Sequence, residues 1–224
     1  AALAGVTALL SLTLPETAPA VLSGATERVR ARLIHPAAVF PGLLVGCGAF
    51  GMAGFLAFLP LYARQVGLDG AALPLAVYAL IVVGLRITFA KLPDQVGAAR
   101  LSGAALAVAS IGLVITVVVP TPPGLIVGTA VFAAGVAFIF PALLSLAVSR
   151  VDEAERGTAV GTTSVFLDAS FGIAPALLGG LAISWGFGGA FLVGAAVAAA
   201  GSVTLIARRG SLAAGEPRGV RSGA

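Results

Sequence analysis

The chain has 224 residues, of which 59% are hydrophobic and 10% are charged, and its mean hydropathy is +1.09. Soluble domains carry about 25% charged residues, so a chain this apolar cannot cover its surface with polar groups and is predicted to be a multi-pass membrane protein. The formal net charge of +4 is modest, and the basic residues are scattered through short loops without interleaved aromatic residues, which argues against nucleic acid as a partner.

Cysteine and histidine are nearly absent from the sequence. Cys47 is the one cysteine and lies in an apolar run, and His35 is the one histidine, beside Pro36 in a polar stretch. An intramolecular disulfide is therefore excluded, and neither a metal site nor chemistry by paired histidines is expected. We also expect no cofactor.

The chain begins with an apolar stretch, residues 1–14, that is shorter than the roughly 20 residues of a membrane span. We interpret it as the end of a truncated transmembrane helix, and hence the chain as a fragment of a longer protein. The alternative is a signal peptide cleaved after Ala18-Pro19-Ala20, but no basic region precedes its apolar part. Residues 15–37 are predicted to be a cytoplasmic linker that its arginines hold near anionic headgroups.

Six apolar segments follow, each close to the length of a tilted transmembrane helix. They cover Ala38–Tyr62, Ala71–Phe89, Leu101–Val119, Leu125–Val148, Thr158–Ile183 and Gly188–Ala207. We therefore predict an all-α bundle of six transmembrane helices over residues 38–207, followed by a cytoplasmic tail over 208–224. The first segment is rich in glycine, which favours close packing between helices.

The basic residues alternate between the two sides of this arrangement. Eleven of the 13 lie in the linker or after the second, fourth and sixth segments: Arg28, Arg30, Arg32, Lys91, Arg100, Arg150, Arg156, Arg208, Arg209, Arg218 and Arg221. The opposite loops hold only Arg64, and Arg86 lies inside a segment. Because cytoplasmic loops are enriched in Lys and Arg, the linker and the C-terminus are both predicted to be cytoplasmic.

Few polar residues lie inside the predicted spans. Asp168 is the one carboxylate well inside a span, where an ionisable group is costly unless it faces protein or water. At helical spacing it shares a small and polar face with Gly161, Ser164, Gly172 and Pro175. We interpret Asp168 and Ser164 as lining a functional cavity; the alternative is an aspartate held by neighbouring polar groups for structural reasons.

The same helix has a second, apolar face, and another helix carries two further candidate cavity residues. Val160, Leu167, Phe171 and Leu178 form the apolar face, which is predicted to meet lipid. Arg86 and Tyr78 are the further candidates. Arg86 can instead extend to the lipid headgroups, and Tyr78 can instead serve packing.

The connection after the second segment carries Lys91-Leu-Pro93-Asp94-Gln-Val-Gly97-Ala-Ala-Arg100. Pro fixes φ and Gly permits positive φ, so a short turn is predicted. This series resembles the loop motif of the major facilitator superfamily (MFS), with Leu92, Pro93, Asp94 and Gly97 matching. Ala90 stands where the family's first glycine would be, and Gln95 replaces an arginine, so the stretch resembles the degenerate copy in the family's C-terminal half.

The later segments resemble helices ten and eleven of bacterial MFS proteins, most closely exporters of drugs, sugars and metabolites. The resemblance rests on Phe140–Arg150, Glu155–Gly161 and Asp168–Gly180. Gly172, Pro175, Gly179 and Gly180 are similar to the family's antiporter motif, with spacing that departs by one residue, and imply helix packing. The resemblance implies that the chain holds the end of helix six and helices seven to twelve, with an N-terminal six-helix half as its missing partner.

The resemblance also implies a function and a mechanism. We expect a transporter of the inner (plasma) membrane that exports a small organic solute in exchange for protons by alternating access, and not an enzyme. Two loops would hold one conformational state of the transporter closed. Their residues are Lys91, Pro93, Asp94, Gly97 and Arg100 in the first loop, and Glu155, Arg156 and Gly157 in the second. The alternatives are an uptake permease of the same fold, an intramembrane enzyme and a membrane scaffold that transports nothing.

Overall fold

The computed structural model describes residues 34–90, 92–149 and 151–208. All regular secondary structure in these ranges is helical, which confirms the all-α class. The elements are α2 (Pro36–Gln65), α3 (Ala72–Thr88), α4 (Leu92–Val96), α5 (Ala98–Val118), α6 (Pro122–Val148), the 3₁₀ turn η1 (Glu153–Glu155) and α7 (Arg156–Ala207). The predicted helix end 1–14, the linker up to residue 33, Lys91, Arg150 and the tail after Arg208 lie outside the described residues.

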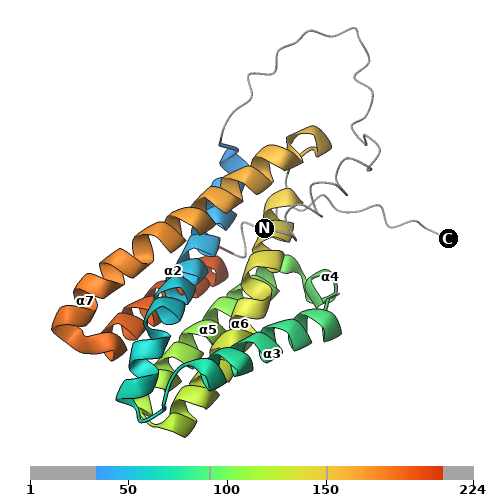
Figure 1. The fold of residues 1–224 in the computed structure, drawn as a ribbon. Coiled ribbons are helices and arrows are strands. Elements are labelled where there is room, and N and C mark those ends of the chain that lie inside the picture. Colours follow the sequence, from blue (N-terminus) through green and yellow to red (C-terminus); the bar gives the residue numbers. More distant parts are fainter. Residues whose placement is uncertain (1–33, 91, 150, 209–224) are drawn as a thin grey trace, which may run out of the picture. The chain divides into compact units, whose positions relative to one another are not determined.

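The last two predicted segments form one helix with a sharp kink. Within α7, Gly186 has φ 69° and ψ 174°, and the chain folds back there, as Figure 1 shows. We call residues 156–185 the first leg of α7 and residues 187–207 its second leg. The predicted break between the segment that ends at Ile183 and the segment that begins at Gly188 is therefore a kink and not a loop, because a single glycine can take a φ that other residues avoid and so reverses the chain.

The second predicted segment is the shortest of the six. Helix α3 has 17 residues, about 26 Å at 1.5 Å per residue, against a hydrocarbon core of about 30 Å. Four helices, α2, α5, α6 and α7, are long and apolar enough to cross a membrane, and α3 is a shorter apolar helix. Because α7 has two legs, these helices supply all six predicted spans.

The connection between α3 and α5 is more elaborate than the predicted turn. It contains the five-residue helix α4, with Pro93 in its first turn, where the missing N–H removes no helical hydrogen bond. Gly97 then has φ 88°, a positive φ that glycine permits, as the turn prediction assumed.

Helix α2 packs most extensively against α7, and its glycines allow the contact. A Cβ on Gly42 would overlap the ring of Phe166, and a Cβ on Gly54 would overlap the side chain of Leu178. Both partners belong to the first leg of α7, which lies beside α2 in Figure 1. The glycines of α2 therefore serve close packing, as predicted.

Buried and half-buried hydroxyl groups donate hydrogen bonds to backbone carbonyls of neighbouring helices. Ser110 of α5 donates to the carbonyl of Ala195 at 2.8 Å, and Ser202 of α7 donates to the carbonyl of Gly103 at 2.8 Å. Ser170 of α7 donates to the carbonyl of Gly46 at 3.1 Å. Such bonds satisfy polar groups where no water reaches and fix the register between helices.

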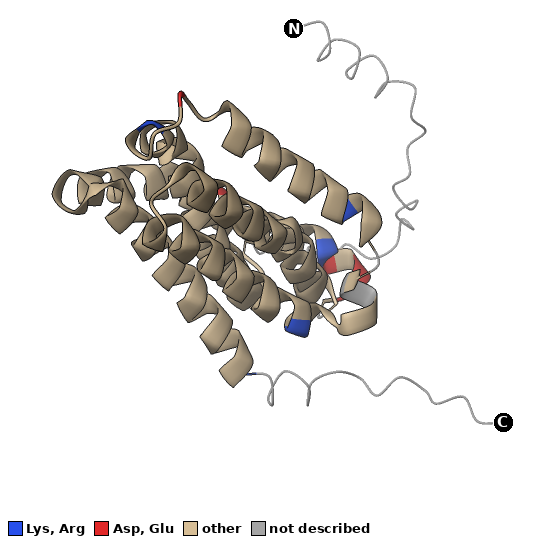
Figure 2. Ribbon diagram, turned by 90° about the horizontal axis from the view of Figure 1, so that it is seen from below, with Lys and Arg blue, Asp and Glu red and all other residues tan. Residues whose placement is uncertain are grey.

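Charged residues lie mostly towards the helix ends, and long stretches of ribbon between them carry none (Figure 2). Two contacts show that helix starts and ends meet at a common end of the bundle. Arg208, just after α7, lies 5.0 Å from the ring centroid of Phe40 near the start of α2, and His35 before α2 contacts Glu155 before α7.

Candidate functional site

Asp168 lies near the middle of the first leg of α7, and it is exposed. On the same face Gly161 and Gly172 are exposed, whereas Ser164 and Pro175 are half-buried. No other residue in the described ranges forms a hydrogen bond or an ion pair with Asp168. In the described ranges, therefore, no side chain buries this carboxylate and no cation pairs with it.

The opposite face of the first leg is buried. Ala159, Thr163 and Ala174 have 0% of their surface exposed, and Leu178 has 1%. The prediction that Leu178 belongs to a lipid face is wrong, because Gly54 of α2 leaves room for its side chain. The first leg thus packs its small and apolar side against α2 and leaves the side of Asp168 open.

The four glycine and proline positions predicted to serve packing differ in their surroundings. A Cβ on Gly179 would lie 3.4 Å from the ring of Phe58, an ordinary contact, whereas Cβ atoms on Gly172 or Gly180 would meet nothing within 4 Å. No helix in the described ranges packs on these last two glycines. Their packing role stays a prediction that needs a partner from outside those ranges.

Arg86, in the last turn of α3, is fixed against α6 by one hydrogen bond. Its Nε donates to the carbonyl oxygen of Ala137 at 3.2 Å. In a regular helix that carbonyl would accept from the N–H of the residue four positions on, but this residue is Pro141, which has none. Arg86 therefore occupies an acceptor that the proline leaves free.

A cavity of about 280 Å³ lies beside Arg86. Phe89 lines it after the end of α3, and Phe138, Phe140 and Pro141 line it from α6. Arg86 is the one charged residue among its lining residues, and the other lining side chains are apolar. The site thus combines a single cation with an aromatic wall.

The two pairs of predicted cavity residues lie on different helix pairs. Arg86 and Tyr78 belong to α3, which packs chiefly on α6, whereas Asp168 and Ser164 belong to the leg of α7 that packs on α2. The Tyr78 hydroxyl donates to the sulfur of Met52 at 3.2 Å. Tyr78 therefore takes part in packing between α3 and α2 and does not line the cavity at Arg86.

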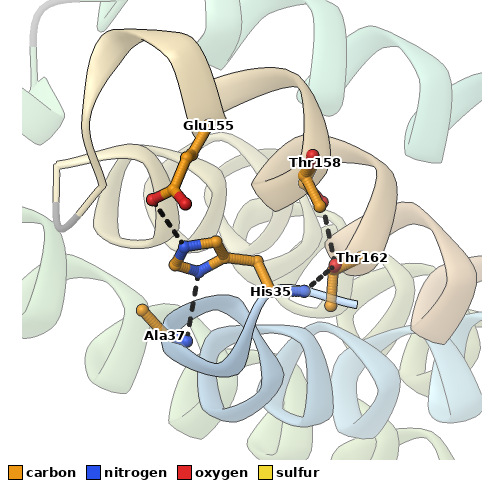
Figure 3. Close-up of polar contacts among 5 residues, drawn as sticks. All are labelled: His35, Ala37, Glu155, Thr158 and Thr162. Atoms are coloured by element: carbon orange, nitrogen blue, oxygen red, sulfur yellow. Dashed lines mark hydrogen bonds and ion pairs between the residues drawn. The ribbon is translucent and has the colours of Figure 1, made fainter. Parts of the chain in front are cut away.

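His35 joins the start of α2 to the start of α7, as Figure 3 shows. Its Nδ1 accepts from the backbone N–H of Ala37 at 3.2 Å, and its Nε2 lies 3.1 Å from the carboxylate of Glu155. Its backbone N–H donates to the Thr162 hydroxyl at 2.9 Å, and that hydroxyl donates to the carbonyl of Thr158 at 2.8 Å. With Nδ1 accepting, the hydrogen of the neutral ring lies on Nε2 and is donated to Glu155.

Comparisons with known proteins agree with this architecture. The family model described as the Major Facilitator Superfamily matches residues 1–175 and 90–222. The chain belongs to the major facilitator superfamily.

Relatives in this superfamily include three that are named uncharacterized MFS-type transporters. Those of Burkholderia mallei (strain SAVP1) and Burkholderia pseudomallei (strain K96243) are each 37% identical over 160 residues, 71% of this chain and 39% of the relative. That of Pseudomonas aeruginosa (strain LESB58) is 33% identical over 164 residues, 73% of this chain and 40% of the relative. The chain thus spans about two fifths of the length of these relatives, and its family is one of membrane transporters rather than enzymes.

The predicted MFS loop elements have different surroundings in this structure. Arg156 pairs with Glu153 at 3.9 Å, but both side chains are more than half exposed, so the pair contributes little stability. Gly157 has open space around it, and Arg100 lies in the first turn of α5. Lys91 and the side chains of Pro93 and Asp94 lie outside the described part of the chain, so the role of these residues stays a prediction.

Sequence reasoning missed the role of His35 in this MFS chain. The prediction placed it in the linker beside Pro36, whereas it is the N-cap of α2 and its side chain is 15% exposed. A polar residue just before a proline at the first helical position is a helix-start signal, and it could have placed His35 at the cap. Its partner Glu155, 120 residues away, has no such signal.

Proposed function

We propose that the chain forms the C-terminal six-helix half of an MFS transporter that exports a small organic solute in exchange for protons by alternating access. Membership of the superfamily supports this proposal, and so do the six apolar spans, which are α2, α3, α5, α6 and the two legs of α7. In such transporters two bundles move around a site near the middle of the membrane. Residues 1–14 would be the end of the preceding helix, and the N-terminal half would cover the exposed face of the first leg of α7.

The uncovered side of Asp168 is the observation that carries the proposal. A membrane helix that faced lipid with a carboxylate and two glycines would be unstable, because an ionisable group in hydrocarbon is costly. The open face with Gly161, Asp168 and Gly172 therefore suits a water-accessible cavity or a second bundle. A carboxylate there can take up a proton when the cavity opens to one side and release it when the cavity opens to the other.

The orientation follows from charge. Arg100, Arg156 and Arg208 lie at one end of the helices, and Arg64 lies at the opposite end of α2. By the positive-inside rule we propose that the end with three arginines is cytoplasmic, in the inner membrane. Solute would then enter from this end during export.

The test is transport by the full-length protein in vesicles under an imposed pH gradient. Asp168→Asn keeps the size and hydrogen-bonding capacity of the side chain but cannot bind and release a proton, so we expect normal folding with loss of proton-driven accumulation. Asp168→Glu should keep part of the activity. The matched control is Asp69→Asn, an exposed aspartate in the loop between α2 and α3, which should transport like the parent.

The choice of solute need not be known in advance, because proton movement itself can be followed. A panel of organic solutes is screened by solute-dependent proton flux in the parent, and the responding solute is then used with each variant. If Asp168→Asn still concentrates solute at the parent rate and with the same dependence on the gradient, Asp168 is structural and the coupling proposal is wrong.

A further inference from the structure

The cavity at Arg86 pairs one cation with an aromatic wall, at the end of α3 that leads to the loop motif. Phe89, Phe138 and Phe140 form the wall, and Arg86 supplies the charge. Arg86 is the one charged residue among the residues that line the cavity, so the cavity favours an anion.

The geometry of Arg86 leaves its strongest donors unused. The hydrogen bond to Ala137 occupies Nε and holds the side chain against α6. Among the side chains that the structure describes, which do not include that of Asp94, no carboxylate pairs with Arg86 and no partner is seen for its two terminal amino groups. These two groups form a fork that matches the two oxygens of a carboxylate.

We propose that this cavity binds a small amphipathic organic anion. Its carboxylate pairs with the terminal amino groups of Arg86, and its apolar body packs on Phe89, Phe138 and Phe140. Pro141 contributes indirectly, because the carbonyl it frees at Ala137 fixes the orientation of the guanidinium. Asp168 takes no part, because it lies on a different helix pair. The proposal concerns binding and does not depend on proton coupling.

The size of the cavity limits the ligand. About 280 Å³ is just below the range of roughly 300–1,000 Å³ found for ligand pockets. One aromatic ring with a short carboxylate chain fits this volume. Arg86 and Phe89 are exposed, so the cavity is open on one side and a lipid headgroup can also reach the arginine. We assign the site to a free solute because the aromatic wall beside the cation suits an anion with an aromatic body, and the experiment distinguishes the two ligands.

The probe is radiolabelled 4-phenylbutyrate, measured by scintillation proximity on the full-length protein in nanodiscs of phosphatidylcholine. We expect saturable binding, competition by unlabelled phenylbutyrate and no competition by the neutral 4-phenylbutanamide. Arg86→Gln should weaken binding by about tenfold or more, because a charge-assisted bidentate pair is lost. Arg64→Gln, at the opposite end of the bundle, is the matched control and should bind like the parent.

A second variant separates loss of the site from loss of the fold. Phe140→Ala removes part of the aromatic wall and keeps Arg86 and Ala137, so it should weaken binding severalfold while thermal unfolding shows a folded protein. The proposal is overturned if the parent shows no saturable binding, if the amide competes as well as the acid, or if Arg86→Gln binds as the parent does. It is also overturned if phosphatidylglycerol in the nanodiscs abolishes probe binding, because a lipid headgroup would then occupy Arg86.

Discussion

The substitution Gly112→Ala tests whether the stability of the bundle depends on the close approach of α5 and α6. A Cβ built at Gly112 would lie 2.5 Å from the Cα and 2.7 Å from the Cβ of Phe132, and would overlap the backbone nitrogen of that residue. Non-bonded carbon atoms pack about 3.5 Å apart or more, so Gly112→Ala forces the two helices apart by about 1 Å. Backbone atoms on both sides cannot rotate away, and Gly135 makes a similar backbone contact with Ala105 and Ala109 further along the helix pair.

The expected cost follows from two opposing terms. Overpacking costs about 1–3 kcal/mol, and a contact between backbones lies at the upper end of that range. Alanine is up to about 1 kcal/mol more favourable than glycine in a helix, so the free energy of unfolding should fall by about 2 kcal/mol in total. At about 2–4 °C per kcal/mol for a domain of this size, the Tm should fall by about 4–8 °C.

The assay is thermal unfolding of the full-length protein in detergent, followed by helical circular dichroism. Gly84→Ala is the matched control, because Gly84 lies within α3 and a Cβ there meets nothing within 4 Å. The control should lose no stability. The packing argument is refuted if Gly112→Ala unfolds at the temperature of the parent or above it.

Two further predictions concern topology and an interhelical hydrogen bond. In a Cys47→Ala background, single cysteines at Arg156 and Arg208 should react with an impermeant reagent from one side of the membrane, and a cysteine at Asp69 from the other; mixed labelling would contradict the alternation of the helices. Tyr62→Phe should lower the free energy of unfolding by about 1 kcal/mol, because the buried Tyr62 hydroxyl donates to the carbonyl of Thr116 at 2.9 Å. Tyr78→Phe should lower it by less, because the Tyr78 hydroxyl donates to a sulfur, which is a weak acceptor. Equal losses in the two variants, measured by thermal unfolding, would contradict this reasoning.

The apolar segments could be predicted from sequence because they depend on composition over about 20 residues. Each predicted segment coincides with a helix or a leg of α7 to within a few residues at its ends, as when α2 begins at Pro36 and not at Ala38. The positive φ of Gly97 and the packing role of the glycines in α2 were also predictable, because both follow from the lack of a Cβ.

Contacts between distant residues could not be predicted in the same way. Arg86 and Ala137 are 51 positions apart, and His35 and Glu155 are 120 apart, so no local pattern pairs them. The burial of Leu178 also depends on a distant residue, because it needs the gap at Gly54. Periodicity places a side chain on a face of its helix, but the neighbouring helix decides whether that face is covered.

The prolines connect the local sequence pattern with the contacts between distant residues. A proline inside or after a helix removes the N–H that the carbonyl four residues earlier would use, and in a membrane that carbonyl needs another donor. Pro141 frees the carbonyl of Ala137, which Arg86 of α3 occupies, and Pro120 frees the carbonyl of Thr116, which Tyr62 of α2 occupies. In both cases a side chain from another helix supplies the donor, so the sequence marks where a partner is required but not which helix provides it. At Pro120 the donor is a neutral hydroxyl in the buried core, whereas at Pro141 it is an arginine that also lines a cavity, and for that reason we propose the second site and not the first for binding.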